Sequence, residues 1–558
     1  MGNKLVLLVK GVGRLAIGGA VAIAVLAFAG ITDPVSAQVE RPQAGDLQRQ
    51  QREEVIPPRM RPEITIEGQR LETLEPGGGR VEIDELLLSG TNAISDDELF
   101  DAIGPFRGES FDLAGLQEIA NTISRYYRDE GFPFAQAYLP AQDVFSGIVR
   151  IDVLEGRYGE VALTGIEQGE LPIGAQRFLD PVSSGQIIRS QRLERSALLI
   201  DEQPGYSAVP VIRPGSRLGR GDLDIEIATN DRVAGSLGFD NHGNYFSGEW
   251  RTRGTLQTRR NLVFGDRFSV TGLYTDEETA LADVSYELPL NGNGLRGRLG
   301  YTRSEYELGG SFEGLFGQSE TVFFELPYAL KRSQQTNLTL RPRAELSDLK
   351  DESPAAPAST KESDAYPVSL EFNHRDAIGG GGIVYGRLTG VYGRLSGDRG
   401  SADANFARVR INATRLQRLP GGVQGMLRVV AQDTRDNLDG SEGISLGGAN
   451  AVRAYPQGEA GGDTGYYLQA ELRYAIGQTG AAPYLFYDAG RSTPYGGEVP
   501  VGQNNSSRKL SGAGLGVRYT ASPFQLNAAV AWRDEGGEPQ SSERNDEPKA
   551  WITGSIRF

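Results

Sequence analysis

The chain has 558 residues, a formal charge of -16, two histidines and no cysteine. This length exceeds one ordinary compact domain. The acidic balance offers no basic face for nucleic acid, and the lack of cysteine excludes disulfides, thiolate nucleophiles and cysteine-ligated zinc. The 74 glycines, with 22 tyrosines and 21 phenylalanines, favour many short aromatic-rich strands.

The first 37 residues have the organisation of a secretory signal. Three basic residues precede an apolar run over 15–31, and small residues end at Ala37. This order predicts export, with cleavage before Gln38. The apolar run is short and ends at a Thr-Asp-Pro break, which argues against a permanent membrane anchor. No later run of about 18 apolar residues occurs, so any further membrane span has to be a strand.

Residues 38–80 are predicted to be a linker in the periplasm. They are rich in Gln, Arg, Glu and Pro and end in three glycines at 77–79. Within them, residues 46–55 have the pattern of a helix that is polar on every side. Such a helix is stable only in water or against a polar wall.

From Val81 the sequence takes a compact α/β pattern. The expected elements are a strand at 81–89, a helix begun by the capping box of Ser95 and Glu98, a second helix at 112–129, and strands at 134–139 and 147–154. This order predicts a small α/β domain over 81–156.

A second unit of the same kind is predicted over 157–230, because VALTG at 161–165 echoes LLLSG at 86–90. Its expected elements are a strand at 161–165, a helix at 190–201, and strands at 207–213 and 222–228. One larger α/β domain spanning both stretches is the alternative. The order of the elements favours two units.

After Asn230 helical spacing gives way to segments of about ten residues in which apolar and polar side chains alternate. The polar stretch at 349–364 is predicted to be an exposed loop and NGNG at 291–294 a tight turn. The chain closes with AWITGSIRF, which alternates up to Phe558 and looks like the targeting signal of bacterial outer-membrane barrels. With the export signal, this favours a membrane barrel over 231–558 above a soluble β-sandwich.

The stretch from 447 to 490 combines a glycine-rich loop that carries Arg453 with two strand-like segments, the second of which carries Asp488. Alternation in that second strand places Phe486, Asp488 and Gly490 on one face and Leu485, Tyr487 and Ala489 on the other. A charge on a strand face needs water or a partner. We therefore expect the Asp488 face to line a water-filled lumen, and we interpret Arg453 as reaching it from a loop folded inside, with two unrelated surface charges as the alternative.

These segments resemble the two-partner secretion transporters of the outer membrane, also called haemolysin secretion and activation proteins. Residues 131–161 and 198–227 look like the ends of the family's first and second polypeptide-transport-associated (POTRA) domains, and FDNHGNYFSGEWR at 239–251 looks like the entry into its barrel. SLGGANAVRAYP at 445–456 is similar to the loop motif VRGY, and FYDAG at 486–490 to the strand motif FxDxG. The difference is Ala454, where the family has glycine, so a backbone with φ above zero is not carried over to that position.

The resemblance implies two periplasmic POTRA domains, over 81–156 and 157–230, followed by an outer-membrane barrel of about sixteen antiparallel strands over 231–558. It also implies a plug formed in the lumen by the polar helix near 46–55. The site residues it implies are Val452, Arg453, Tyr455, Phe486, Asp488 and Gly490 as a translocation motif in the lumen, and Phe558 as a barrel-assembly signal. The implied partners are a large β-helical secreted exoprotein, outer-membrane lipid and the barrel-assembly machinery, with no nucleic acid, metal or other cofactor.

The predicted function is that POTRA domains capture an unfolded exoprotein and the barrel exports it to the cell surface. No glycine-lysine pair of a P-loop and no H-E-x-x-H pair follows the signal. We therefore expect a transporter that is not an enzyme and works without nucleotide hydrolysis. One alternative is a barrel assembly and insertion factor, which usually carries more than two POTRA domains. Another is a passive porin, which leaves the POTRA-like segments unexplained.

Overall fold

The structure is a computed structural model that describes residues 43–45, 73–144, 146–165, 172–354, 356–397 and 404–558. The predicted signal at 1–37 and the predicted polar helix at 46–55 lie outside these ranges. None of the described helices is long and apolar enough to span a membrane.

The first α/β unit has its own sheet, in the order β2-β5-β4, with β2 parallel and β4 antiparallel to β5. Its elements are β1 (Val81–Glu82), β2 (Glu85–Ser89), α2 (Asp96–Ile103), β3 (Ser110–Phe111), α3 (Leu113–Asp129), β4 (Gln136–Tyr138) and β5 (Ile148–Leu154). The capping box is confirmed, because Ser95 and Glu98 bond to each other's backbone N–H. The prediction of a single strand over 81–89 is wrong. The chain breaks at Ile83 and Asp84 because β1 pairs with β3, whereas β2 pairs with β5.

One face of α3 forms the core of this unit. Leu116, Ile123 and Tyr127 of α3 are buried in one cluster with Val149 and Ile151 of β5. This confirms the helical spacing read from the sequence over 112–129. Burial raises the pKa of the Tyr127 hydroxyl well above its ordinary value. The hydroxyl therefore stays a neutral donor at ordinary pH.

The second α/β unit has a sheet in the order β6-β8-β7 and a separate apolar core. Its elements are β6 (Arg157–Thr164), η1 (Ala175–Val182), α4 (Ser190–Asp201), β7 (Tyr206–Pro214) and β8 (Arg220–Thr229). The helix predicted over 190–201 is confirmed. The 3-10 helix η1 was not predicted from the sequence.

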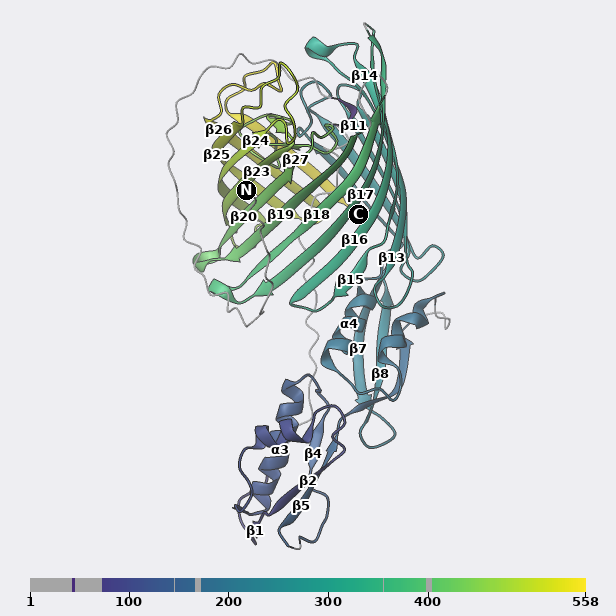
Figure 1. Cartoon of the computed structure of the whole chain (residues 1–558), viewed down its shortest axis with the longest axis vertical. Helices are drawn as coiled ribbons and strands as arrows, with labels where there is room; N and C mark the ends of the chain where they lie inside the picture. Colours follow the sequence, from purple (N-terminus) through teal and green to yellow (C-terminus); the bar gives the residue numbers. More distant parts are fainter. Residues whose placement is uncertain (1–42, 46–72, 145, 166–171, 355, 398–403) are drawn as a thin grey trace, which may run out of the picture. The chain divides into compact units, whose positions relative to one another are not determined.

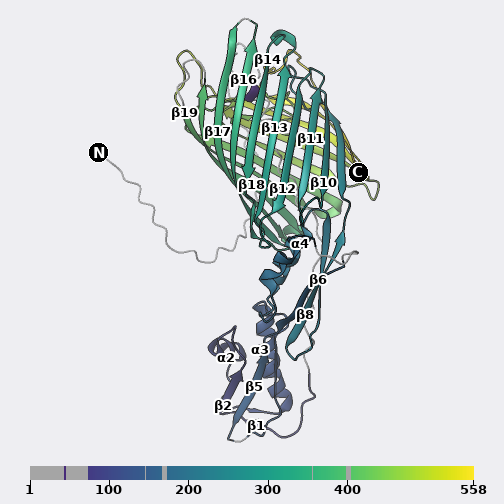
Figure 2. The ribbon, with the colours of Figure 1, turned by 90° about the vertical axis from the view of Figure 1, so that its right-hand side faces the viewer.

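Within the described residues, sixteen antiparallel strands close into a barrel, with β14 and β15 as two parts of one strand that both pair with β16 (Figures 1 and 2). The sixteen-stranded barrel expected from the sequence is thus confirmed. The strands are β9 (Val233–Asp240), β10 (Arg251–Arg259), β11 (Arg267–Thr275), β12 (Ala280–Pro289), β13 (Arg296–Glu307), β14 (Phe316–Glu325), β15 (Tyr328–Lys331), β16 (Thr336–Ser353), β17 (Ala356–Asp376), β18 (Gly382–Gly397), β19 (Ala404–Arg418), β20 (Val423–Thr434), β23 (Thr464–Tyr474), β24 (Ala481–Thr493), β25 (Arg508–Ala521), β26 (Phe524–Glu535) and β27 (Lys549–Arg557). The connections include the 3-10 turns η2 (Gly310–Phe312), η3 (Ile378–Gly380) and η4 (Pro420–Gly422), and the short strands β21 (Ile444–Ser445) and β22 (Gly461–Gly462).

Side chains alternate between the outside and the inside of the barrel as predicted. On β24, Leu485 and Tyr487 are 63% and 47% exposed, whereas Phe486 and Asp488 are buried. Exposed Leu and Tyr side chains recur on the outer face of the other strands. An outer wall of this kind is suited to hydrocarbon, and the polar inner face to a lumen.

The prediction of an exposed loop over 349–364 is wrong. These residues form the ends of β16 and β17, which pair in one register as far as Asp351 and Ser359 and, after a shift, once more at Ser353 and Ala356. A polar composition does not prevent strand pairing, because the strands are joined by backbone hydrogen bonds and an antiparallel sheet can have a solvated face. The turn predicted over 291–294 is confirmed between β12 and β13.

The barrel closes where β27 pairs with β9, from Thr553 opposite Asp240 to Arg557 opposite Ser236. Beyond this ladder, Gly235 and Phe558 exchange two backbone hydrogen bonds of 2.7 and 3.0 Å. A Cβ atom at Gly235 would lie 2.5 Å from the Phe558 ring. A side chain at position 235 would therefore displace the Phe558 ring.

Candidate functional site

The connection between β20 and β23, residues 435–463, folds into the barrel, and we call it the inner loop. It has an apolar core of its own: Ile444, Leu446, Val452 and Tyr455 are fully buried. The same cluster includes Trp551 and other side chains of the barrel wall. The inner loop is therefore packed against the wall as part of the folded barrel.

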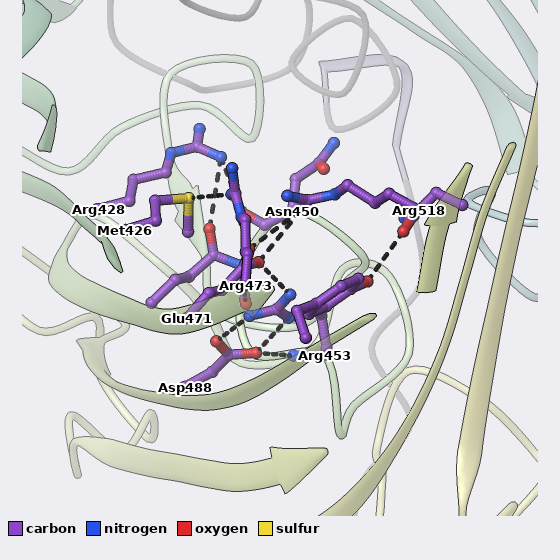
Figure 3. A network of polar contacts seen from close by, with 12 residues as sticks. Met426, Arg428, Asn450, Arg453, Glu471, Arg473, Asp488 and Arg518 are labelled. Carbon is purple, nitrogen blue, oxygen red and sulfur yellow. Dashed lines mark hydrogen bonds and ion pairs between the residues drawn. The ribbon is translucent and has the colours of Figure 1, made fainter. Parts of the chain in front are cut away.

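Arg453 of the inner loop contacts Asp488 of β24 (Figure 3). Its Nε and Nη2 atoms donate to the two oxygens of the Asp488 carboxylate, each over 2.7 Å, and its backbone N–H donates over 3.1 Å. The guanidinium carbon lies 3.6 Å from the centre of the Phe486 ring. Asp488 is fully buried and Arg453 nearly so. This two-pronged contact fixes the loop in orientation as well as in position.

A second carboxylate, Glu471 of β23, also holds Arg453. Nη1 of Arg453 donates to Glu471 over 2.6 Å, and Arg473 and Arg518 lie 2.7 and 3.1 Å from the same carboxylate (Figure 3). Sequence reasoning missed Glu471. The alternation in TGYYLQAELRY puts Gln469, Glu471 and Arg473 on one face, so the pattern shows which face Glu471 shares but not that it meets Arg453.

The other predicted motif residues lie close by and support the same packing. Val452 donates its N–H to the Leu446 carbonyl over 2.7 Å, and the Tyr455 hydroxyl donates to the Glu535 carbonyl over 2.9 Å. A Cβ atom at Gly490 would lie 2.8 Å from a backbone oxygen of β23. The same Cβ atom would lie 3.2 Å from the Leu446 side chain of the inner loop, so glycine at 490 lets the inner loop approach the wall. The indole N–H of Trp551 donates to the Arg453 carbonyl over 2.7 Å.

Ala454 does not need the backbone conformation that glycine permits. It is buried and does not have a positive φ. Its methyl group points at Gly512 of β25, where a Cβ atom would lie only 2.3 Å away. Gly512 therefore provides the space that this alanine requires.

Glu459 fixes the inner loop to the connection between β26 and β27, residues 536–548. It is fully buried, accepts from the N–H and hydroxyl of Ser541 over 2.8 and 2.6 Å, and pairs with Arg508 of β25. Sequence reasoning also missed this contact. Glu459 lies in a loop, where no periodic pattern indicated a partner.

Within the residues that the structure describes, neither histidine lies in a group of side chains able to hold a metal ion. The described part of the chain contains no cluster of three or more His, Asp or Glu side chains able to hold a metal ion. His242 lies edge-on to Trp551, and His374 shares a hydrogen bond of 2.9 Å with Thr336.

An apolar outer wall, a polar lumen and a loop fixed inside the barrel define an outer-membrane β-barrel protein. The family model described as haemolysin secretion/activation protein ShlB/FhaC/HecB matches residues 219–519, more than half of the chain. A model of the ShlB-type POTRA domain matches residues 81–156. The chain therefore belongs to the haemolysin secretion/activation protein family, and the resemblance to two-partner secretion transporters is confirmed. This is a family of outer-membrane transporters, with its POTRA domains in the periplasm, and not a family of enzymes.

Relatives match most of the chain at low identity. The heme/hemopexin transporter protein HuxB of Haemophilus influenzae (strain 86-028NP) is 24% identical over 514 residues, 88% of this chain and 91% of its own. The outer membrane transporter CdiB of Escherichia coli O6:K15:H31 (strain 536 / UPEC) is 24% identical over 71% of this chain and 69% of its own. The solved structure of CdiB from Escherichia coli has a TM-score of 0.70 at 19% identity, covering 88% of this chain and 93% of that chain. The last comparison shows a shared fold.

Proposed function

We propose that this protein exports one unfolded secreted polypeptide, of the large β-helical kind, through its barrel to the cell surface. The observation that carries the proposal is the docked inner loop. A loop held in the lumen by Arg453, Asp488 and Glu471 obstructs passage, yet it is held by polar contacts that can be broken and made again. A transporter needs such an obstruction to remain closed at rest, whereas a purely structural loop has no need of paired charges.

In this proposal the POTRA domains capture the exported polypeptide in the periplasm by adding it as a further strand to one of their sheets. In the first unit, β2 lies at the edge of its sheet, contains no proline and exposes Leu87. An extended polypeptide can add to such an edge by main-chain hydrogen bonds, with little demand on its sequence. The edge strand β7 of the second unit carries Pro210 and Pro214, which lack an N–H. Of these two edge strands, β2 keeps a backbone N–H at every residue, and we assign first capture to its edge.

Export proceeds without nucleotide hydrolysis in this proposal, because the sequence has no P-loop lysine. Folding of the polypeptide outside the cell makes its return unfavourable and so gives the transport its direction. Barrel-assembly machinery inserts the protein itself, with Phe558 as part of the recognised signal. Purified protein in vesicles should export an unfolded partner in the absence of nucleotide, and a strict nucleotide requirement would contradict this point.

The test of export compares a deletion strain with the same strain complemented by variants. We expect one secreted polypeptide to disappear from the medium on deletion and to return with the parent protein. Arg453→Ala and Asp488→Ala should still assemble as heat-modifiable barrels but export poorly, because export in this proposal needs an inner loop that can return to its docked position. Arg303→Gln is the matched control, because Arg303 lies on the outer face of β13, paired with Glu305 and Glu320. Normal export by both motif variants would refute the proposal.

Two further measurements separate the remaining alternatives. An assembly and insertion factor predicts that other outer-membrane barrels fall in amount on deletion, which export alone does not. A plug within residues 38–60 predicts a higher single-channel conductance when these residues are removed. Unchanged conductance would count against the plug.

A further inference from the structure

A cavity of about 200 Å³ lies between the inner loop and the barrel wall, and its lining has more cations than anions. Arg428 of β20, Arg453 of the inner loop and Arg518 of β25 line it. Glu471 is the one carboxylate among its described lining residues. The cavity is therefore cationic, although the chain as a whole has a formal charge of -16. The excess of arginine is a local feature of this cavity.

The carboxylates near the cavity are already used by other cations. Glu471 is shared by Arg453, Arg473 and Arg518. Asp488, next to the cavity, accepts three hydrogen bonds from Arg453. Neither carboxylate is left to neutralise a further arginine.

Arg428 is the cation without a carboxylate. Its donors reach only neutral oxygens at the limit of hydrogen bonding: the Asn450 carbonyl at 3.4 Å, Gln469 at 3.5 Å and Asn412 at 3.4 Å. No ion pair is formed by Arg428 within the part of the chain that the structure describes. A half-buried guanidinium with only long, neutral contacts is well suited to gain a carboxylate, which makes shorter and stronger hydrogen bonds.

We propose that this cavity is an anion-binding site that takes the carboxylate side chains of the exported polypeptide, with Arg428 as its first contact and Arg518 as its second. The proposal rests on the export function above and adds the chemical class of the segment that is recognised. Gln469 and Asn527 also line the cavity and supply neutral hydrogen-bonding groups beside the two arginines. Acidic segments are held at this point of the lumen, and lysine- and arginine-rich segments are repelled.

The test measures binding of fluorescent hexaglutamate and hexaglutamine peptides to the purified full chain in detergent, by anisotropy. We expect the parent to bind hexaglutamate at least about tenfold more tightly than hexaglutamine, as for a charge-assisted hydrogen bond. Arg428→Gln should reduce this preference to threefold or less. Arg303→Gln on the outer face and Arg341→Gln, a luminal arginine paired with Glu325 outside the cavity, should leave the preference unchanged.

Three results would overturn the proposal: equal binding of the two peptides by the parent, an unchanged preference in Arg428→Gln, or an equal loss in Arg341→Gln. Displacement of hexaglutamate by inorganic phosphate at the same charge concentration would reassign the cavity to small free anions. Measuring export by the same variants distinguishes failure of this proposal from failure of the export proposal. If Arg428→Gln loses the peptide preference but exports as fast as Arg303→Gln, the cavity has no part in export, and the export proposal itself still stands.

Discussion

Replacing Asp488 with asparagine removes the charge that holds Arg453 and keeps the size of the side chain. Asp488 is fully buried and accepts three hydrogen bonds from Arg453. Removing one partner of a buried ion pair costs about 3–5 kcal/mol. Because Glu471 remains 2.6 Å from the guanidinium and still neutralises it, we place the cost at the lower end, about 3 kcal/mol. The ratio of undocked to docked inner loop should then rise roughly 150-fold.

The undocked population can be measured through a single cysteine. The chain has none, so Ala451→Cys creates a unique thiol at a position in the inner loop that is only 6% exposed. A maleimide reagent reaches this thiol when the loop leaves the wall. The labelling rate therefore follows the undocked fraction as long as undocking is faster than labelling. We expect Asp488→Asn to raise this rate by about two orders of magnitude.

The matched control is Glu305→Gln, which removes a carboxylate from the exposed end of β13 and should leave the labelling rate unchanged. A rate for Asp488→Asn within threefold of the parent would refute the reasoning, because it would mean that packing alone holds the loop. A rise of the same size in the control would mean that the assay reports general loosening of the barrel.

Three other substitutions test separate contacts. Glu459→Gln removes the carboxylate that pairs with Arg508 and should cost about 3 kcal/mol. The effect should be seen as faster tryptic cleavage after Arg544 in the adjoining connection. Unchanged cleavage would count against that anchor. Gly490→Ala forces a methyl group against the neighbouring strand and should cost about 1–3 kcal/mol. The effect should be seen on SDS gels as a lower temperature of unfolding. An unshifted transition would contradict the close approach of the two strands at Gly490. Ser95→Ala removes the cap of α2 at a cost of about 1 kcal/mol. The backbone amide hydrogens of α2 should then exchange with solvent roughly fivefold faster. Equal exchange would show that the cap is not needed.

Features with a local cause were predictable from the sequence. Helix α4 was predicted at its full extent because apolar residues at helical spacing identify its buried face. The inward and outward sides of β24 followed from strict alternation. The contact between Arg453 and Asp488 was expected from the family resemblance of the two motifs; the charges alone also allowed two unrelated surface groups.

Features that depend on which strands are neighbours were not predictable. Glu471 reaches Arg453 because β23 pairs with β24 in a register that sets Glu471 beside Phe486, and no local pattern determines that register. The break at Ile83 arises because adjacent short strands pair with different partners. Residues 349–364 have the polar composition of a loop, yet they belong to the paired strands β16 and β17, where backbone hydrogen bonds hold them in place.

The closure of the barrel has a consequence for the order of its assembly. Nearly all neighbouring strands are joined by short connections and can pair as soon as they are made. The seam instead joins Asn241 to Ile552, 311 positions apart. Until β27 is in place, β9 presents a row of unpaired backbone N–H and C=O groups, which is costly in hydrocarbon. The growing sheet therefore has an exposed edge until the end, and its insertion into the membrane depends on something that covers this edge first.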